Sequence, residues 1–168
     1  MTSTAPVSDA HKIVTALSTA GKTLAVAESC TGGLLAASIV DVPGASAIFK
    51  GGIVSYSNEI KAGVLGVPQT ILDNYGAVSS ECAGAMAEGA LTLLKTDIAC
   101  STTGIAGPGG ATPAKPVGTV WFGVARKNGP TSTRLFLFKG DRASIRAQSV
   151  AAAQRLILEA IGRRTDET

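Results

Sequence analysis

The chain is organised around one stretch, Ala27-Glu28-Ser29-Cys30-Thr31-Gly32-Gly33. Residues 23–27 before it form a short apolar run that follows Gly21, which predicts a buried strand. Residues 34–39 after it are rich in helix formers and predict a buried helix. The stretch is therefore a sharp strand-to-helix turn, with Ser29 where the strand ends. A serine in such a turn serves as an exposed nucleophile, a phosphate ligand or an N-cap, and the local residues leave all three open.

The length and composition predict one α/β domain. The 168 residues are 45% hydrophobic and 16% charged with 20 glycines, which is typical of a tightly packed protein with many turns and opposite to a disordered chain. The net charge of +3 is mild, and no Lys/Arg run indicates nucleic acid as the main partner. No apolar run reaches the length of a membrane span, and residues 1–6 lack the order of a signal peptide. We expect a single domain over residues 1–168, with residues 1–7 flexible.

The few cysteines and the single histidine narrow the chemistry. Three cysteines without metal-site spacing indicate reduced thiols in the cytoplasm, and with one histidine they predict no metal site. His11 falls in the predicted N-terminal helix, remote from the other polar segments, so a Ser-His-Asp triad is not expected. Cys82 and Cys100 stand in apolar contexts and are predicted to pack in the core.

Hydrophobic periodicity and punctuating residues predict the order of the elements. The turn at residues 127–130 is too short for a crossover helix, so the two strands around it are antiparallel. The order predicts a three-layer α/β/α sandwich on a mixed, mainly parallel sheet with an antiparallel C-terminal hairpin. The expected helices cover 8–20, 34–39, a short segment capped by Ser57 or Asn58 and closed by Gly66 and Pro68, 79–94, and a last helix capped by Asp141; the expected strands cover 23–27, 51–55, 98–103, 119–126 and 131–139.

The third long helix carries small residues that suggest close packing. Gly84 and Gly89 weaken a helix, so we expect them to allow close approach of the sheet or of another subunit. On this pattern a homodimer is expected.

Three segments leave the carboxyl ends of predicted parallel strands, where open α/β sheets bind ligands: 28–33, 55–61 and 102–110. If Ser29 is a nucleophile, Lys61 is the candidate base, provided that burial or nearby cations lower its pKa from about 10.4. The pattern alone favours a solvated helix lysine instead. Cys30 is a rival nucleophile, because thiolates at helix N-termini have lowered pKa values.

Other residues near these segments also have two readings. Tyr56 has two interpretations: it relays or orients a proton, or it is simply an amphipathic aromatic residue at the end of a strand. The glycine-rich loop 104–118 lacks a P-loop ending and is at most a generic phosphate or ribose cradle. Arg142, just inside the last helix, would clamp a phosphate or cover the sheet edge.

Several strings together resemble one known family. Residues 27–33, Tyr56-Ser57-Asn58, and 104–110 with 115–120 are similar to the CinA C-terminal domain family, the competence/damage-inducible proteins whose stand-alone members include nicotinamide-nucleotide amidohydrolases. Segments 76–79 and 140–142 match as well, so the resemblance extends from about residue 14 to residue 160. Many members carry a further molybdopterin-binding-like domain, for which 168 residues leave no room.

The resemblance implies hydrolysis of the carboxamide of nicotinamide mononucleotide to nicotinic acid mononucleotide and ammonia, without a metal or cofactor. It implies Ser29 as the nucleophile and Lys61 as the base, with Tyr56 assisting. An alternative is a non-catalytic nucleotide-binding or regulatory module that uses the same cleft. The residues expected to bind the small-molecule nucleotide are Glu28, Cys30, Thr31, Gly32, Asn58, Thr103, Gly104 and Arg142.

Overall fold

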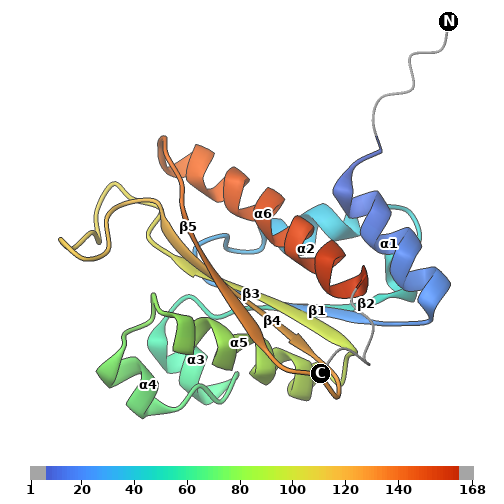
Figure 1. Ribbon diagram of the computed structural model, residues 1–168, viewed down its shortest axis with the longest axis horizontal. Helices are drawn as coiled ribbons and strands as arrows, with labels where there is room; N and C mark the ends of the chain where they lie inside the picture. Colours follow the sequence, from blue (N-terminus) through green and yellow to red (C-terminus); the bar gives the residue numbers. More distant parts are fainter. Residues whose placement is uncertain (1–6, 163–168) are drawn as a thin grey trace, which may run out of the picture.

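A five-stranded sheet forms the middle layer of the protein, as the computed structural model, which describes residues 7–162, shows (Figure 1). The strand order is β2-β1-β3-β4-β5, with β1 parallel to both β2 and β3 and antiparallel ladders from β3 to β4 and from β4 to β5. Only β4 therefore runs against the other four, which confirms the mixed, mainly parallel sheet and its C-terminal hairpin. The strands are β1 (Leu24–Glu28), β2 (Phe49–Val54), β3 (Ile98–Gly104), β4 (Thr119–Arg126) and β5 (Ser132–Leu137).

Helices cover both faces of the sheet and complete the predicted three layers (Figure 1). One face carries α1 (Asp9–Ala20), α2 (Leu34–Val40) and α6 (Arg142–Gly162), and the other carries α3 (Asn58–Gly63), α4 (Gln69–Asn74) and α5 (Ser80–Leu94). Of residues 1–7, which were expected to be flexible, residues 1–6 lie outside the described residues. None of the helices within 7–162 combines the length and the apolar character that crossing a membrane requires.

Predicted residues cap or end α1, α3 and α6, whereas the Ser79 cap of α5 was not predicted. The hydroxyls of Ser8, Ser57 and Ser79 accept N–H bonds from the first turns of α1, α3 and α5. Asp141 accepts from the Ser144 N–H at 2.8 Å and so caps α6. Gly21 ends α1 in the left-handed conformation, with φ of 61°. Two short elements were not predicted: α4, which follows Pro68 directly, and a 3-10 turn at Ala45–Ala47.

Two apolar clusters form the core. The larger packs α1, α2 and α6 against the sheet and contains Phe122, which meets Phe136 edge-on at a ring-centroid distance of 5.4 Å. The smaller lies between the sheet and α5 around Met86. Cys82 and Cys100 are fully buried in these clusters, as their sequence context predicted. The two clusters fix the strand ends from both sides.

The small residues of α5 are used within the chain. A Cβ on Gly89 would stand 2.0 Å from the carbonyl oxygen of Leu65, so α5 lies directly against the backbone that joins α3 to α4. Gly84 faces the methyl group of Thr133 on β5, 3.5 Å from where its Cβ would be. Close packing of both glycines thus has an explanation inside one chain, with the sheet for Gly84 and with a neighbouring connection for Gly89.

Candidate active site

The strand ends that the sequence predicted to converge surround one cavity of about 210 Å³. It receives residues from the turn after β1, the β2–α3 connection, the end of β3 and the start of α6. Three of its wall residues, Ala77, Val78 and Ala106, were not predicted. The lining residues are Ser29, Cys30, Tyr56, Asn58, Lys61, Ala77, Val78, Thr103, Gly104, Ala106 and Arg142.

Lys61 is buried and touches Ser29. Its side chain points inward from the last turn of α3 with 1% of its surface exposed, so the solvated-lysine alternative is wrong. Its Nζ lies 3.0 Å from the Ser29 Oγ. Burial lowers the pKa of Lys61 below its ordinary value of 10.5, and the thiols of Cys82 and Cys30 oppose this shift. A buried amine with a lowered pKa therefore lies within hydrogen-bond distance of the Ser29 hydroxyl.

Two main-chain carbonyls orient the side-chain amine of Lys61. Its Nζ donates to the Ser55 carbonyl at 2.7 Å and to the Tyr56 carbonyl at 3.3 Å. A neutral amine has two N–H groups and one lone pair, and a carbonyl oxygen only accepts. With both N–H groups on carbonyls, the lone pair of the neutral form faces the hydroxyl of Ser29, which can donate. The arrangement suits a base that removes the serine proton.

Glu28 does not line the cavity, which corrects its predicted contact with substrate. The residue is fully buried, and its carboxylate accepts three N–H groups at the start of α2, from Gly33 and Leu35 at 3.0 Å and from Ala36 at 2.8 Å. Glu28 thus does the capping that Gly33, the residue at the N-cap, cannot do with a side chain. These donors are consequently not available to a phosphate, and Ser29 does not cap α2.

Thr31 and Gly32 also shape the turn instead of lining the cavity. Thr31 is fully buried, and its hydroxyl shares a hydrogen bond of 2.7 Å with the hydroxyl of Thr102, a partner that the sequence analysis missed. Gly32 adopts a φ of +58°, and a Cβ there would lie 3.3 Å from the Arg146 guanidinium. Thr31 and Gly32 were expected to bind the nucleotide; the structure instead gives both a structural role in the turn.

Accounting for the backbone N–H groups of the turn leaves one donor at the cavity wall. From Ser29 to Ala36, all are bonded within the described chain except those of Cys30 and Thr31. Thr31 is buried away from the cavity, whereas Cys30 lines it. The Cys30 N–H, on the residue directly after Ser29, is thus the unbonded backbone donor of the turn that belongs to a residue lining the cavity.

The Cys30 thiol does not have the character of a nucleophile. Burial raises its pKa to about 11, with its own N–H opposing and the charge of Glu28 adding to the rise. The cations of Arg146 and Lys61 lower it only in part. The predicted lowering of this thiol pKa is therefore wrong, because desolvation of the thiolate outweighs the nearby cations.

Arg142 and Tyr56 meet at the mouth of the cavity. The Arg142 Nη1 donates to the Gly107 carbonyl at 2.8 Å and its Nη2 to the Tyr56 hydroxyl at 3.2 Å. The Tyr56 side chain is 63% exposed, and only its carbonyl reaches Lys61. Its phenol thus bonds the arginine, not Ser29 or Lys61, which corrects the predicted proton relay.

Three further predicted residues complete the wall. Thr103 donates its hydroxyl to the Ala77 carbonyl at 2.7 Å and ties the end of β3 to the segment before α5. Gly104 has no room for a side chain, since a Cβ would lie 2.7 Å from the Thr119 carbonyl oxygen. Asn58 opens α3 and lines the cavity.

Arg146 is the main residue that the sequence analysis missed. It lies one helical turn after Arg142 on α6, and this four-residue spacing on one face was the available signal. Its Nε donates to the Cys30 carbonyl at 3.0 Å and its Nη2 to the Thr31 carbonyl at 2.9 Å.

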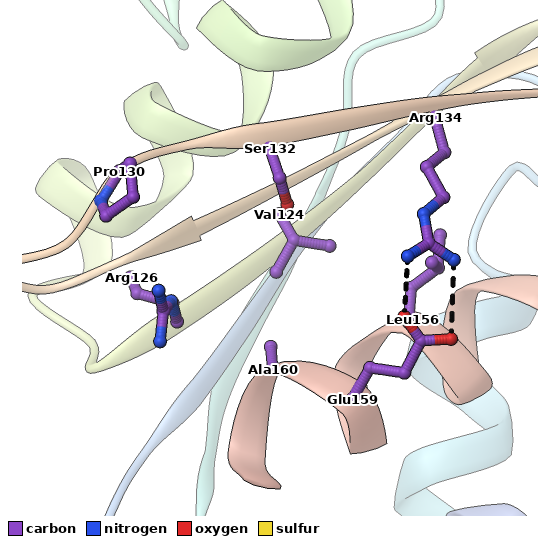
Figure 2. Close-up of a pocket in the computed structure, with 8 residues that line it drawn as sticks. All are labelled: Val124, Arg126, Pro130, Ser132, Arg134, Leu156, Glu159 and Ala160. Atoms are coloured by element: carbon purple, nitrogen blue, oxygen red, sulfur yellow. Dashed lines mark hydrogen bonds and ion pairs between the residues drawn. The ribbon is translucent and has the colours of Figure 1, made fainter. Parts of the chain in front are cut away.

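A smaller hollow of about 90 Å³ lies between the β4–β5 hairpin and the end of α6 (Figure 2). Ser132 is the hydroxyl that lines it, and Glu159 is the carboxylate. Figure 2 shows Glu159 paired with Arg134, at 3.0 Å between Nη2 and Oε2. With that carboxylate engaged, the hollow presents no nucleophile–base pair among its lining residues.

The fold and the site together define the class of protein: it is an α/β/α domain with a buried Ser–Lys contact at the ends of its strands. The family model of the CinA C-terminal domain matches residues 7–161, and the chain belongs to this family, which confirms the resemblance. The CinA-like protein of Leptospira borgpetersenii is 55% identical over 124 residues, covering 74% of this chain and 30% of that protein. The CinA-like protein of Mycolicibacterium gilvum is 51% identical over 142 residues, covering 84% and 34%. The chain thus spans about a third of the curated relatives it matches.

Solved structures share the whole fold. The competence/damage inducible protein CihA from Agrobacterium tumefaciens superposes with a TM-score of 0.89 at 37% identity, covering 92% of this chain and 94% of that one. A competence-damaged protein (CinA) superfamily protein from Escherichia coli gives a TM-score of 0.85 at 34% identity, covering 89% and 88%.

Proposed function

We propose that this chain is an amidohydrolase that converts nicotinamide mononucleotide to nicotinic acid mononucleotide and ammonia. The observation that carries the proposal is the 3.0 Å contact between the Ser29 Oγ and the Nζ of a lysine that is 1% exposed. A lysine used only for charge would favour water or a carboxylate, whereas a buried amine held by two carbonyls is suited to accept a proton.

The chemistry runs in two halves. The Ser29 Oγ attacks the carboxamide carbon, its proton passes to Lys61, and the carbonyl electron pair moves onto oxygen beside the Cys30 N–H. Lys61 then gives the proton to the amide nitrogen, the C–N bond breaks and ammonia leaves. Water attacks the resulting ester with Lys61 again as base, and the acid is released as Ser29 regains its proton. The cationic pyridinium ring withdraws electrons from the amide and eases the first attack.

Arg142 supports a nucleotide substrate. A guanidinium has five N–H donors, and the bonds to Gly107 and Tyr56 hold it at the cavity mouth without using them all. A phosphate binds such a fork bidentately. We infer that Arg142 binds the substrate phosphate and thereby orients the amide towards Ser29.

Ammonia release tests the proposal. The protein is incubated with nicotinamide mononucleotide, with nicotinamide riboside or with free nicotinamide, and ammonia is measured by a coupled assay. The expected order of rates is nucleotide, riboside, free base, with Ser29→Ala as the inactive control. A protein that binds the nucleotide by calorimetry but releases no ammonia would instead be the nucleotide-binding or regulatory module.

A further inference from the structure

Arg146 holds the nucleophile turn from a helix far away in the sequence. It stands in α6, 116 residues from Cys30, and its guanidinium bonds two successive carbonyls of the turn, those of Cys30 and Thr31. Both bonds are partly buried. Gly32 leaves the room that the guanidinium occupies, as a Cβ there would lie 3.3 Å from Nη2. The turn therefore supports the contact in two ways: it supplies two carbonyl acceptors, and Gly32 leaves space for the guanidinium.

Planar peptide groups connect the bonds of Arg146 to the backbone N–H of Cys30, a residue that lines the cavity. In a trans peptide, the C=O and the N–H point in opposite directions, and the turn contains no cis bond. The peptide whose carbonyl Arg146 binds at Thr31 ends in the Gly32 N–H, which donates to the Ser29 carbonyl at 3.1 Å. The peptide that holds this carbonyl ends in turn in the Cys30 N–H, the donor at the cavity wall. One hydrogen-bonded chain thus links Arg146, two peptide planes and the Cys30 N–H.

We propose that Arg146 is a positioning residue that aims and polarises the Cys30 N–H towards the oxyanion formed on Ser29 attack. The proposal rests on the proposed function. The planes fix the direction of the donor before reaction, and the guanidinium charge polarises each hydrogen bond along the chain towards the cavity. The second bond, from Nε to the Cys30 carbonyl, prevents the peptide between the two planes from flipping.

The test uses a probe that forms a tetrahedral adduct whatever the natural substrate is. A fluorophosphonate reacts with Ser29 as the Oγ–P bond forms, the P–F bond breaks, fluoride leaves and the proton passes to Lys61. Its phosphoryl oxygen takes the place of the oxyanion. Labelling rates are measured by intact-protein mass spectrometry for wild type, Arg146→Met, Arg146→Lys and the control Arg155→Met, which removes an exposed arginine of the same helix.

Arg146→Met is expected to label about 10- to 100-fold more slowly, somewhat less than the roughly 10²- to 10³-fold cost of removing an oxyanion donor outright. Arg146→Lys should fall between, and Arg155→Met should match wild type. With nicotinamide mononucleotide, kcat should fall while KM stays within about threefold. The amide should also lose more than the matching thioamide, because sulfur is a weak hydrogen-bond acceptor and depends less on the donor.

Either of two results with the Arg146 variants would overturn the proposal, and so would an unreactive wild type. One is folded Arg146→Met that labels within twofold of Arg155→Met. The other is equal loss for amide and thioamide, which would indicate a purely structural role. Should Arg146→Met be unfolded by circular dichroism, Arg146→Lys decides on the same criteria. A wild type that labels at Ser29 but releases no ammonia from the nucleotide overturns the proposed substrate, and Arg146 is then judged on labelling alone. A wild type that neither labels nor hydrolyses overturns both.

Discussion

Glu28→Gln should destabilise the protein strongly although it removes only a charge. The wild-type carboxylate is fully buried, with Oε2 accepting the N–H groups of Gly33 and Leu35 and Oε1 accepting that of Ala36. A glutamine oxygen can keep the first two bonds, but its NH₂ group then faces the third N–H, donor against donor.

The magnitude follows from these bonds. Losing one charge-assisted bond and leaving a buried donor unsatisfied costs roughly 2–4 kcal/mol. For a domain of this size each kcal/mol lowers the Tm by about 2–4 °C, so we expect a decrease on the order of 5–15 °C. Thermal and urea unfolding followed by circular dichroism measure it, with Glu88→Gln, an exposed glutamate of α5, as the matched control. A Glu28→Gln protein less than 1 kcal/mol below Glu88→Gln would refute the role assigned to this carboxylate.

Three further predictions concern the two basic residues of the site. Lys61→Arg keeps a charge but cannot release its proton, so turnover should vanish while calorimetric binding of the nucleotide persists; a near-normal rate would make Lys61 merely electrostatic. Because the pKa of Lys61 is lowered in the folded state, the unfolded chain binds more protons, so wild-type stability relative to Lys61→Met should rise with pH up to about 10.5, and a flat difference in urea titrations would contradict the burial. Arg142→Ala should lower affinity for the nucleotide about 10- to 100-fold and leave weak riboside hydrolysis nearly unchanged, whereas equal losses would remove Arg142 from phosphate binding.

Local pattern was enough to predict the framework. The strand-turn-helix around Ser29 and the caps at Ser8 and Ser57 follow from short-range apolar spacing and turn chemistry, and the structure has them within a few residues. The convergence of the segments that carry Ser29 and Lys61 followed from parallel strand ends meeting at one edge of the sheet, although the pattern alone favoured a solvated Lys61. The short helix α4 was not predicted, because Gly66 and Pro68 indicate the end of the preceding helix. A proline also commonly stands at the start of a helix, as Pro68 does here.

Hydrogen bonds to main-chain carbonyls, and contacts between residues far apart in the sequence, could not be predicted from local sequence patterns. The Ser55 carbonyl that orients Lys61 has no signature, because every residue has a carbonyl. Arg146 reaches the turn from 116 residues away, and nothing near Cys30 indicates it. Glu28 was expected at the substrate only from the family resemblance, yet its carboxylate accepts N–H groups at the start of α2.

The central claim, that Ser29 and not its neighbour is the nucleophile, is tested most directly by steady-state ammonia release from nicotinamide mononucleotide by Ser29→Ala and Cys30→Ala. The serine has the lysine at 3.0 Å, and the cysteine has a thiol whose pKa is about 11 and contributes only its N–H. We predict that Ser29→Ala binds the nucleotide but releases no ammonia, while Cys30→Ala keeps most of the wild-type rate and resists thiol-blocking reagents. An active Ser29→Ala beside a folded, inactive Cys30→Ala would contradict the account.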